Sequence, residues 1–282
     1  MPDPGLVEPL ASIDAQRLQR LAGAWGREFR EAVPFPHLVI DDFLKPEVAE
    51  AILSEFRVPA DQAVHWKHYN ENKHGLTRID LMGPATQGFI REVSSPRFTA
   101  FLEELTGIGP LLADPDLDGA GLHETPPGGF LNMHVDFLSH TLRSNWSRQL
   151  NLLLYLNKDW KEEYNGFIEF WDMKEKKRYR KVKPAFNRCV LFQTTRTSWH
   201  GYPARLACPP GTTRKSIALY YYREEAAPLA LNPTFYQYLP DDPLAKKALV
   251  VLDRWALKVY SFIKRRSLIS DRVVSAVLRF LR

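Results

Sequence analysis

Between residues 121 and 223 the chain consists of short strand-like segments with no helical segment between them. The segments read "AGLHETPPGGFLNMHVDF", "RQLNLLLYLN", "NGFIEFWDM", "RYRKVKPAFNRCVLFQTT" and "TRKSIALYYYR", and Pro, Gly and Asn mark the turns that separate them. Short strands at such spacing are typical of jelly rolls and barrels, in which a sheet closes on itself. We therefore predict a double-stranded β-helix, a cupin-like jelly roll, over this part of the chain.

Helical patterns flank the predicted barrel. Amphipathic spacing predicts helices over residues 12–32 and 97–107, with Gly107 as the C-cap of the second. Residues 58–78 have no clear period and predict a long exposed loop. The predicted class is thus mainly β with flanking helices (α+β). It has three parts: N-terminal support of the barrel over residues 1–120, the double-stranded β-helix core over 121–223, and a helical extension over 224–282.

The stretch "FLNMHVDFLSH", residues 130–140, alternates apolar and polar side chains. Because side chains alternate between the two faces of a strand, one face is apolar and the other carries Asn132, His134 and Asp136. A solvated polar face is the commoner explanation for such a strand. The alternative is a polar face that points into the barrel and binds a ligand.

A second histidine, His200, follows a later strand-like segment, in "FQTTRTSWHGYP". Together with His134 and Asp136 it completes a 2-His-1-carboxylate pattern, which suits non-haem Fe(II) and leaves positions open for O2 and a chelating substrate. His140 has the same parity as His134 and is a rival ligand. Because it follows Asp136 by four residues, we expect it in a loop beyond the rim of the barrel.

Arg214 and Ser216 share one face of "TRKSIALYYY", and Tyr155 lies on the polar face of "RQLNLLLYLN". A guanidinium inside a barrel is costly unless it meets an anion, and its planar fork matches a carboxylate. Arg214 is therefore a candidate for binding a carboxylate, to which Tyr155 could add a phenol. A rim arginine paired with a glutamate and a core tyrosine with a satisfied hydroxyl are the alternatives.

With "HVD" at residues 134–136, His200, and Arg214 with Ser216, the sequence resembles the Fe(II)- and 2-oxoglutarate-dependent oxygenases. The motifs "LLLYLNKDW", "NGFIEFW", "VKPAFNRCVLF" and "HGYP" are similar to those of the prolyl 4-hydroxylase-like branch, and the resemblance spans residues 35–223. It implies that His134, Asp136 and His200 are the iron ligands and the catalytic residues. It also implies that Arg214 binds the distal carboxylate of 2-oxoglutarate, with help from Tyr155 and Ser216.

The resemblance implies a reaction that uses Fe(II), 2-oxoglutarate and O2 to hydroxylate an unactivated C–H, with release of succinate and CO2. Asp136 favours hydroxylation over halogenation, because a Gly or Ala there would leave a position for a halide. Several relatives place a tyrosine near Glu124, and its absence leaves the proximal carboxylate of 2-oxoglutarate without an assigned partner. Two other classes stay open: a cupin-type metal dioxygenase that does not use 2-oxoglutarate, and a non-catalytic jelly-roll binding protein. Arg214 argues against the first, and the complete triad argues against the second.

The candidates for the primary substrate are a prolyl or other residue of a protein, a free amino acid, and a sugar or lipid intermediate. We expect residues 58–78 and 137–147 to border the substrate entrance, where Arg143, Trp146 and Arg148 are candidates for contact with the substrate.

The net charge of +5 is concentrated at one end, because residues 244–282 hold ten Lys and Arg against two Asp. Leu252, Trp255, Val259 and Phe262 follow helical spacing there and predict a basic amphipathic helix. This helix either packs on the barrel or a second subunit, or it lies on an anionic membrane. No nucleic-acid partner is expected.

The cellular location is predicted from the N-terminus and from the cysteines. The N-terminal residues have neither a basic start nor an apolar core, and Cys189 and Cys208 form no disulfide framework. We expect a cytoplasmic protein, peripheral to the inner face of a membrane if the C-terminal helix binds lipid, with Cys189 as core packing.

Overall fold

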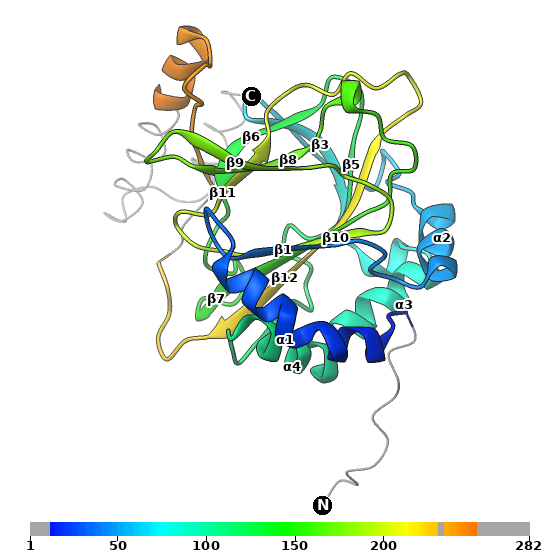
Figure 1. Cartoon of the computed structure of the whole chain (residues 1–282). Helices are drawn as coiled ribbons and strands as arrows, with labels where there is room; N and C mark the ends of the chain where they lie inside the picture. Colours follow the sequence, from blue (N-terminus) through cyan, green and yellow to red (C-terminus); the bar gives the residue numbers. More distant parts are fainter. Residues whose placement is uncertain (1–11, 231–233, 253–282) are drawn as a thin grey trace, which may run out of the picture.

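One curled sheet dominates the structure, a computed structural model that describes residues 12–230 and 234–252 (Figure 1). Its strands are β1 His37–Ile40, β2 Val64–His68, β3 Glu71–Leu76, β4 Leu112–Ala113, β5 Gly121–Thr125, β6 Phe130–Val135, β7 Trp146–Tyr155, β8 Ile168–Asp172, β9 Lys177–Val182, β10 Arg188–Gln193, β11 Trp199–Tyr202, β12 Arg214–Glu224 and β13 Phe235–Tyr236. The helices are α1 Ala15–Glu31, α2 Pro46–Glu55, α3 Pro84–Val93 and α4 Pro96–Thr106, with 3-10 turns at Ile79–Leu81 and Glu162–Tyr164. Residues 244–252 form a further helix.

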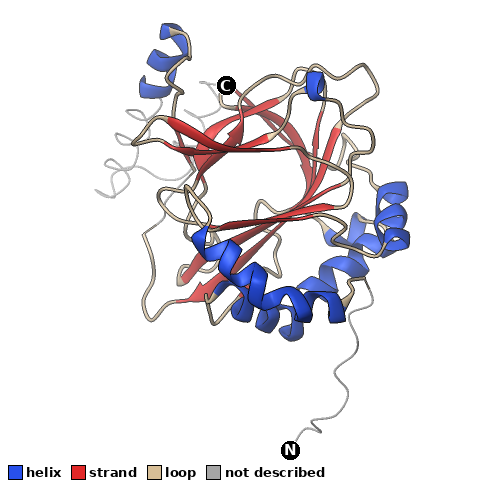
Figure 2. Ribbon diagram, in the orientation of Figure 1, coloured by secondary structure: helices blue, strands red, loops and turns tan. Residues whose placement is uncertain are grey.

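The sheet curls into two facing walls that are joined along one side. Its main path runs β1-β10-β7-β12-β5-β3-β6-β11-β8-β9. β1, β10, β7, β12 and β5 form one wall, β6, β11, β8 and β9 form the other, and β3 joins the walls on one side (Figure 2). This is the arrangement of a double-stranded β-helix, so the predicted jelly-roll core is confirmed.

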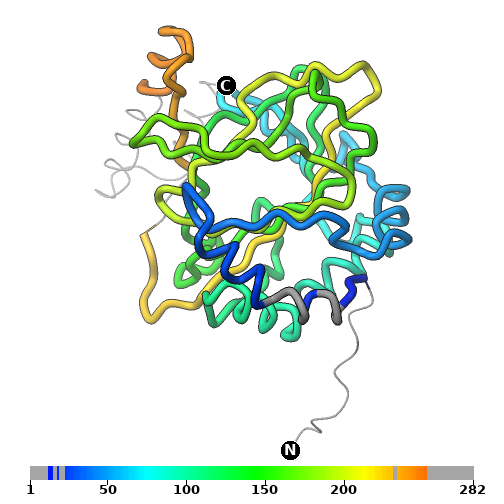
Figure 3. The backbone as a smooth tube through the Cα atoms, in the orientation of Figure 1, coloured from blue at the N-terminus to red at the C-terminus, as the bar shows by residue number. Residues whose placement is uncertain are grey.

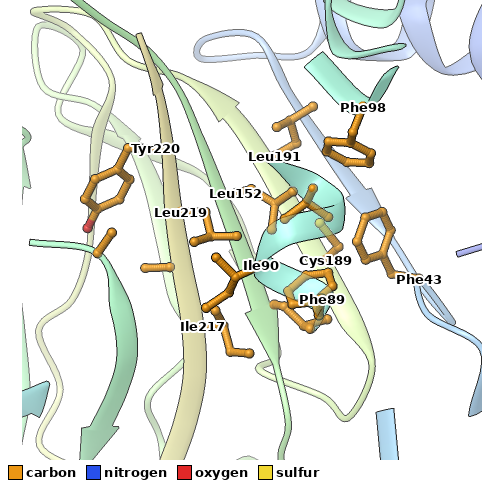
Figure 4. Packing of buried hydrophobic residues seen from close by; sticks show 14 of the residues in the cluster. Phe43, Phe89, Ile90, Phe98, Leu152, Cys189, Leu191, Ile217, Leu219 and Tyr220 are labelled. Carbon is orange, nitrogen blue, oxygen red and sulfur yellow. The ribbon is translucent and has the colours of Figure 1, made fainter. Parts of the chain in front are cut away.

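Helices α1 to α4 pack on the outer face of the wall that contains β7, β10 and β12 (Figure 2). Alternate residues of β7 point outward into this layer, and Leu150, Leu152 and Leu154 are at most 1% exposed. Figure 4 shows Phe98 of α4 beside Leu191 of β10, with Phe89 of α3 beside Cys189. Cys189 is therefore core packing, as expected. Burial of each leucine contributes about 1.5–3 kcal/mol, so this layer holds the wall rigidly behind the barrel interior.

The N-terminal segments belong to the same barrel as the core. In Figure 3 the blue and cyan part of the chain runs around the green and yellow strands. β1 pairs with β10, and β3 pairs with both β5 and β6. Residues before 121 therefore supply part of the barrel wall as well as its helical support.

The prediction of a loop over residues 58–78 is wrong. These residues form the β2–β3 hairpin, and β3 fills the space between β5 and β6. The reason lies in the side chains. β2 is largely exposed, and the inward face of β3 carries the ion pair of Glu71 and Lys73 in place of apolar residues. No apolar alternation marks the hairpin in the sequence.

The predicted helices are found with shifted ends. α1 begins at Ala15, and Ser12 donates its backbone N–H to the carboxylate of Glu92. α4 has Ser95 as its N-cap, and Gly107 ends it with φ of 74°, so the predicted C-cap is confirmed.

The segment that follows β12 runs back to β6, the strand that carries His134. β13 pairs with β6, so that Tyr236 lies opposite His134. Trp255, Val259 and Phe262 of the predicted amphipathic helix lie outside the described residues. Among the residues that are described, no helix is both long and apolar enough to cross a membrane.

Candidate metal and cosubstrate site

Two adjacent strands bring the predicted triad together at one end of the barrel. His134 of β6 lies directly opposite His200 of β11, and Asp136 follows β6. The Nε2 atoms of His134 and His200 each lie 3.5 Å from a carboxylate oxygen of Asp136. One ligand atom from each residue lies within 4.8 Å of the other two, so the three side chains can converge on one metal ion.

Backbone carbonyls fix the orientation of both imidazoles. Nδ1 of His134 donates to the carbonyl of Asn132 and Nδ1 of His200 to that of Ser198, each at 2.9 Å. A carbonyl can only accept, so each proton resides on Nδ1 and each Nε2 lone pair faces Asp136. Metal-binding histidines are commonly held in this way by their second nitrogen.

The protonation states also suit a divalent metal. Burial, partly opposed by Asp136, lowers the pKa of His200 to about 3, so its imidazole is neutral at physiological pH. Burial alone would raise the pKa of Asp136, but the guanidinium of Arg148 and the neighbouring histidines hold it well below its usual value. The donor set is therefore two imidazoles, each with Nε2 directed at Asp136, and one carboxylate, which fits Fe(II).

Asp136 is held by a buried arginine and a buried amide of β7. Nη2 of Arg148 lies 3.2 Å from Oδ2 of Asp136, and Nδ2 of Asn151 donates to the same oxygen at 2.6 Å. Nε of Arg148 also donates to Oδ1 of Asn151 at 2.7 Å, so Arg148, Asn151 and Asp136 all contact one another. Arg148 was predicted at the substrate entrance. It is 2% exposed and engaged with Asp136, so its main contact is with the triad.

Arg214, at the start of β12, faces the same cavity as the triad. Its Nε donates to the carbonyl of Gly166 at 2.7 Å and its Nη2 to the hydroxyl of Tyr155 at 3.1 Å. The guanidinium carbon lies 4.1 Å from the ring centroid of Tyr202. Arg214 is 4% exposed and has no ion pair with any carboxylate in the part of the chain that the structure describes. Ser216 lines the cavity beside it, and Tyr155 lies behind the guanidinium.

The alternation predicted for the strand of His134 holds only in part. The pairing of β11 with β6 is irregular, so that Tyr202 lies opposite Leu131 while His200 lies opposite His134. Leu131 and His134 both line the cavity as a result. Asn132, predicted to face the cavity, instead donates to the carbonyl of Tyr69 and to Oδ1 of Asn70. A β-bulge of this kind changes the face of every residue on one side of it.

Arg143 and Trp146 lie outside the cavity lining. Nη2 of Arg143 pairs with Asp116 at 2.7 Å, and its guanidinium lies 4.8 Å from the ring centroid of Trp146. Both belong to a loop cluster around His140, which is fully buried.

His140 is not a fourth ligand of the triad. Its Nδ1 accepts from the backbone N–H groups of Leu142 and Arg143, so its proton resides on Nε2 and is donated to Asp114 at 3.1 Å. Asp114, Asp116 and His140 could converge on an ion by distance. Because both nitrogens of His140 are already engaged, we interpret the cluster as a hydrogen-bonded link between two loops.

Glu124 does not point into the cavity, because it accepts a hydrogen bond from Thr213 near the surface. The inward position on β5 is His123, which lies opposite Ser216 and lines the cavity. Burial and the nearby Lys73 lower the pKa of His123 to about 3. Lys73 itself also lines the cavity. It could not be predicted there, because the hairpin that carries it has no apolar alternation in the sequence.

Comparisons with known proteins agree with this geometry. Residues 120–222 match the sequence model of the 2OG-Fe(II) oxygenase superfamily. No curated protein matches the sequence. A prolyl-4-hydroxylase from Pseudomonas putida has a similar fold, with 15% sequence identity and a TM-score of 0.51 over 71% of this chain and 99% of that one. A prolyl hydroxylase from Trichoplax adhaerens, solved with a peptide fragment of the hypoxia inducible factor oxygen degradation domain, is 19% identical, with a TM-score of 0.51 over 73% of this chain and 91% of that one.

Residues 120–222 therefore carry the sequence pattern of the 2OG-Fe(II) oxygenase superfamily, and the fold of the chain is like that of the prolyl 4-hydroxylases. The family of this region uses Fe(II), 2-oxoglutarate and O2, and the donor set and cavity described above suit these groups.

Proposed function

We propose that His134, Asp136 and His200 bind Fe(II), and that Arg214 binds the distal carboxylate of 2-oxoglutarate. The buried guanidinium of Arg214 carries this proposal, because it shares a cavity with the triad and has no carboxylate partner within the described residues. A buried cation of this kind is stabilised by an anionic ligand. A dioxygenase that does not use 2-oxoglutarate would have no need of it.

The surrounding residues orient the two ends of the cosubstrate. Gly166 and Tyr155 hold the guanidinium of Arg214 by Nε and one Nη2 proton, which leaves other N–H donors for a carboxylate. The hydroxyl of Tyr155 accepts from Arg214 and can donate its own proton to the same carboxylate, while Ser216 offers a hydroxyl along the wall. Bound Fe(II) supplies the activation of O2, and the barrel positions the target C–H and excludes water.

The test of this function is release of succinate from 2-oxoglutarate, measured with and without Fe(II). We expect iron-dependent release in the wild type and none above background in His134→Ala, Asp136→Ala or His200→Ala. We also expect an anaerobic Fe(II)–2-oxoglutarate charge-transfer band in the wild type that is absent from His200→Ala. A band of equal intensity in His200→Ala would show that the ligand assignment is wrong.

The primary substrate is proposed as a residue of a protein, a free amino acid, or a sugar or lipid intermediate. The Trichoplax adhaerens structure holds a peptide, which makes peptides a reasonable first class to test. Stimulation of succinate release by one class in a panel, with a product heavier by one oxygen, would identify it.

We also propose that residues 244–282 contact an anionic membrane from the cytoplasmic side. In the described start of this segment, Leu244, Leu249 and Leu252 are 83%, 49% and 67% exposed, while Val250 is buried. A helix that leaves leucines uncovered beside lysines is suited to a lipid surface.

A further inference from the structure

A lysine from outside the jelly-roll core points into the cavity. Lys73 lies on β3 of the β2–β3 hairpin, and its side chain is 15% exposed. It lines the same cavity as the triad and Arg214. Its Nζ lies 3.4 Å from Oε2 of Glu71 and 5.0 Å from the ring centroid of Trp66.

Lys73 keeps donor capacity that its neighbours do not use. Glu71 is shared, because its Oε1 also accepts from Nε2 of His68 at 3.0 Å and from the hydroxyl of Tyr236 at 3.1 Å. An ammonium group has three N–H donors. Among the described residues, the long ion pair with Glu71 is the one carboxylate contact of Nζ. Burial would lower the pKa of Lys73, but Glu71, Tyr202, Tyr220 and Asp136 together raise it above its usual value, so the side chain stays charged.

Lys73 lines the cavity together with Tyr202 and Tyr220, two tyrosines that contact arginines at its two ends. Tyr202 and Tyr220 are its electrostatic neighbours, as is Asp136. Tyr202 stacks on the guanidinium of Arg214. The guanidinium carbon of Arg148, the partner of Asp136, lies 3.3 Å from the ring centroid of Tyr220. An extended 2-oxo diacid with its distal carboxylate on Arg214 therefore presents its other carboxylate toward the triad and Lys73.

His123 cannot serve this carboxylate as a cation. It occupies the inward position on β5, and its Nε2 donates to the carbonyl of Gly119 at 3.1 Å. Its low pKa keeps the ring neutral. We propose that Lys73 binds the 1-carboxylate of 2-oxoglutarate, a role taken by a residue of the N-terminal hairpin. This inference rests on the proposed function, because it needs Arg214 at the other end of the same ligand.

The test compares two ligands that share one end. 2-Oxoglutarate has both carboxylates, whereas 2-oxobutyrate has the 1-carboxylate and the 2-oxo group but no distal carboxylate. Affinity is measured anaerobically with Fe(II) by titrating the charge-transfer band of the bound 2-oxo acid, so turnover is not required. The variants are Lys73→Met, Lys73→Arg and Arg214→Met, with Lys67→Met on the exposed face of β2 as a matched control.

We expect Lys73→Met to weaken both ligands about 10- to 100-fold, as the loss of a charge-assisted hydrogen bond predicts. Lys73→Arg should recover part of the loss, and Lys67→Met should match the wild type. Arg214→Met should weaken 2-oxoglutarate and leave 2-oxobutyrate unchanged. The double variant Glu71→Gln/Lys73→Met avoids an unpaired buried carboxylate and should bind as weakly as Lys73→Met.

Two results would overturn the inference. Unchanged affinity of Lys73→Met and of the double variant for both ligands would show that Lys73 does not meet the cosubstrate. Weakening of 2-oxoglutarate alone would place Lys73 at the distal end. If the wild type gave no band with either ligand, the proposed function itself would fail, which is a different outcome from either of these.

Discussion

Arg214 is a buried charge whose contacts are those of a binding group. Gly166 and Tyr155 hold its position but do not neutralise it. Replacing Arg214 with Ala should raise the 2-oxoglutarate concentration needed for half-maximal succinate release, with a cost of about 2–5 kcal/mol in cosubstrate binding. Fe(II) affinity without 2-oxoglutarate should stay within twofold of the wild type. An unchanged 2-oxoglutarate requirement would favour the cupin-type dioxygenase that does not use this cosubstrate.

We expect Arg148 to influence the proposed metal through its contact with Asp136. It forms an ion pair with the carboxylate of Asp136 and is almost entirely buried. Loss of a partner that orients a metal ligand typically lowers metal affinity 10- to 100-fold. We expect this loss in Arg148→Met, measured by competition with a chelator, and partial recovery in Arg148→Lys. The exposed Arg196, replaced by Met, serves as the control. Equal chelator competition in all three would show that Arg148 has no part in holding Asp136.

The residues that the sequence predicted are those whose chemistry is visible within one strand or one motif. His134 and Asp136 lie in one strand-like stretch of the sequence, and His200 and Arg214 lie in later stretches of the same kind. Lys73 could not be predicted in this way, because its place depends on the pairing of β3 with strands more than forty residues later. Arg148 was predicted at the substrate entrance, but its contact with Asp136 was not predicted. The β12–β7 pairing is irregular near Tyr221, so the alternation along β7 does not show which face Arg148 occupies.

At the scale of elements, β1 places a histidine in an apolar part of the barrel. His37 is 1% exposed, donates from Nδ1 to the carbonyl of Phe35, and has its ring 4.7 Å from that of Phe170. Burial lowers its pKa to about 4. The unfolded chain, with an ordinary pKa near 6.5, binds this proton first as the pH falls.

The metal-free protein should therefore lose stability between pH 6.5 and pH 4. His37 alone contributes a slope of up to about 1.4 kcal/mol per pH unit in this window. The lowered pKa values of His123 and His200 make the free energy of unfolding fall with decreasing pH in the same direction. Denaturant unfolding across this range should show a shallower fall for His37→Gln than for the wild type. The exposed His65→Gln is the control, and parallel curves for all three proteins would contradict a buried, neutral His37.

Elements with an apolar face could be predicted from sequence, and those without one could not. β7 and β10 alternate clearly because their outer faces pack on the helices. The β2–β3 hairpin has an exposed face and a charged one, so its period is hidden. β13 is two residues long and is recognisable only by its pairing with β6.

At the scale of the whole molecule, segments from both sides of the core complete the site. β3 brings Lys73 and Glu71 from the N-terminal side, and β13 brings Tyr236 from the C-terminal side. The hydroxyl of Tyr236 donates to Glu71, so a hydrogen bond joins β13 to β3. The cavity is therefore a product of three parts of the chain, although the sequence match covers residues 120–222.

The chain runs from β13, which pairs with β6 beside His134, into the helix of residues 244–252 with its exposed leucines. The proposed membrane contact therefore follows β13 directly along the chain. Each Lys or Arg near an anionic surface adds about 1 kcal/mol, so the ten basic residues of 244–282 should make binding strong and sensitive to salt. We expect the full chain to co-sediment with vesicles that contain anionic lipid and not with neutral vesicles. Replacing Lys264, Arg265 and Arg266 with Gln, or Leu249 and Leu252 with Ser, should reduce binding at least tenfold without changing the unfolding transition. Equal sedimentation of the variants and the wild type, or binding that ignores both salt and lipid charge, would assign the segment to packing on the barrel or on a second copy.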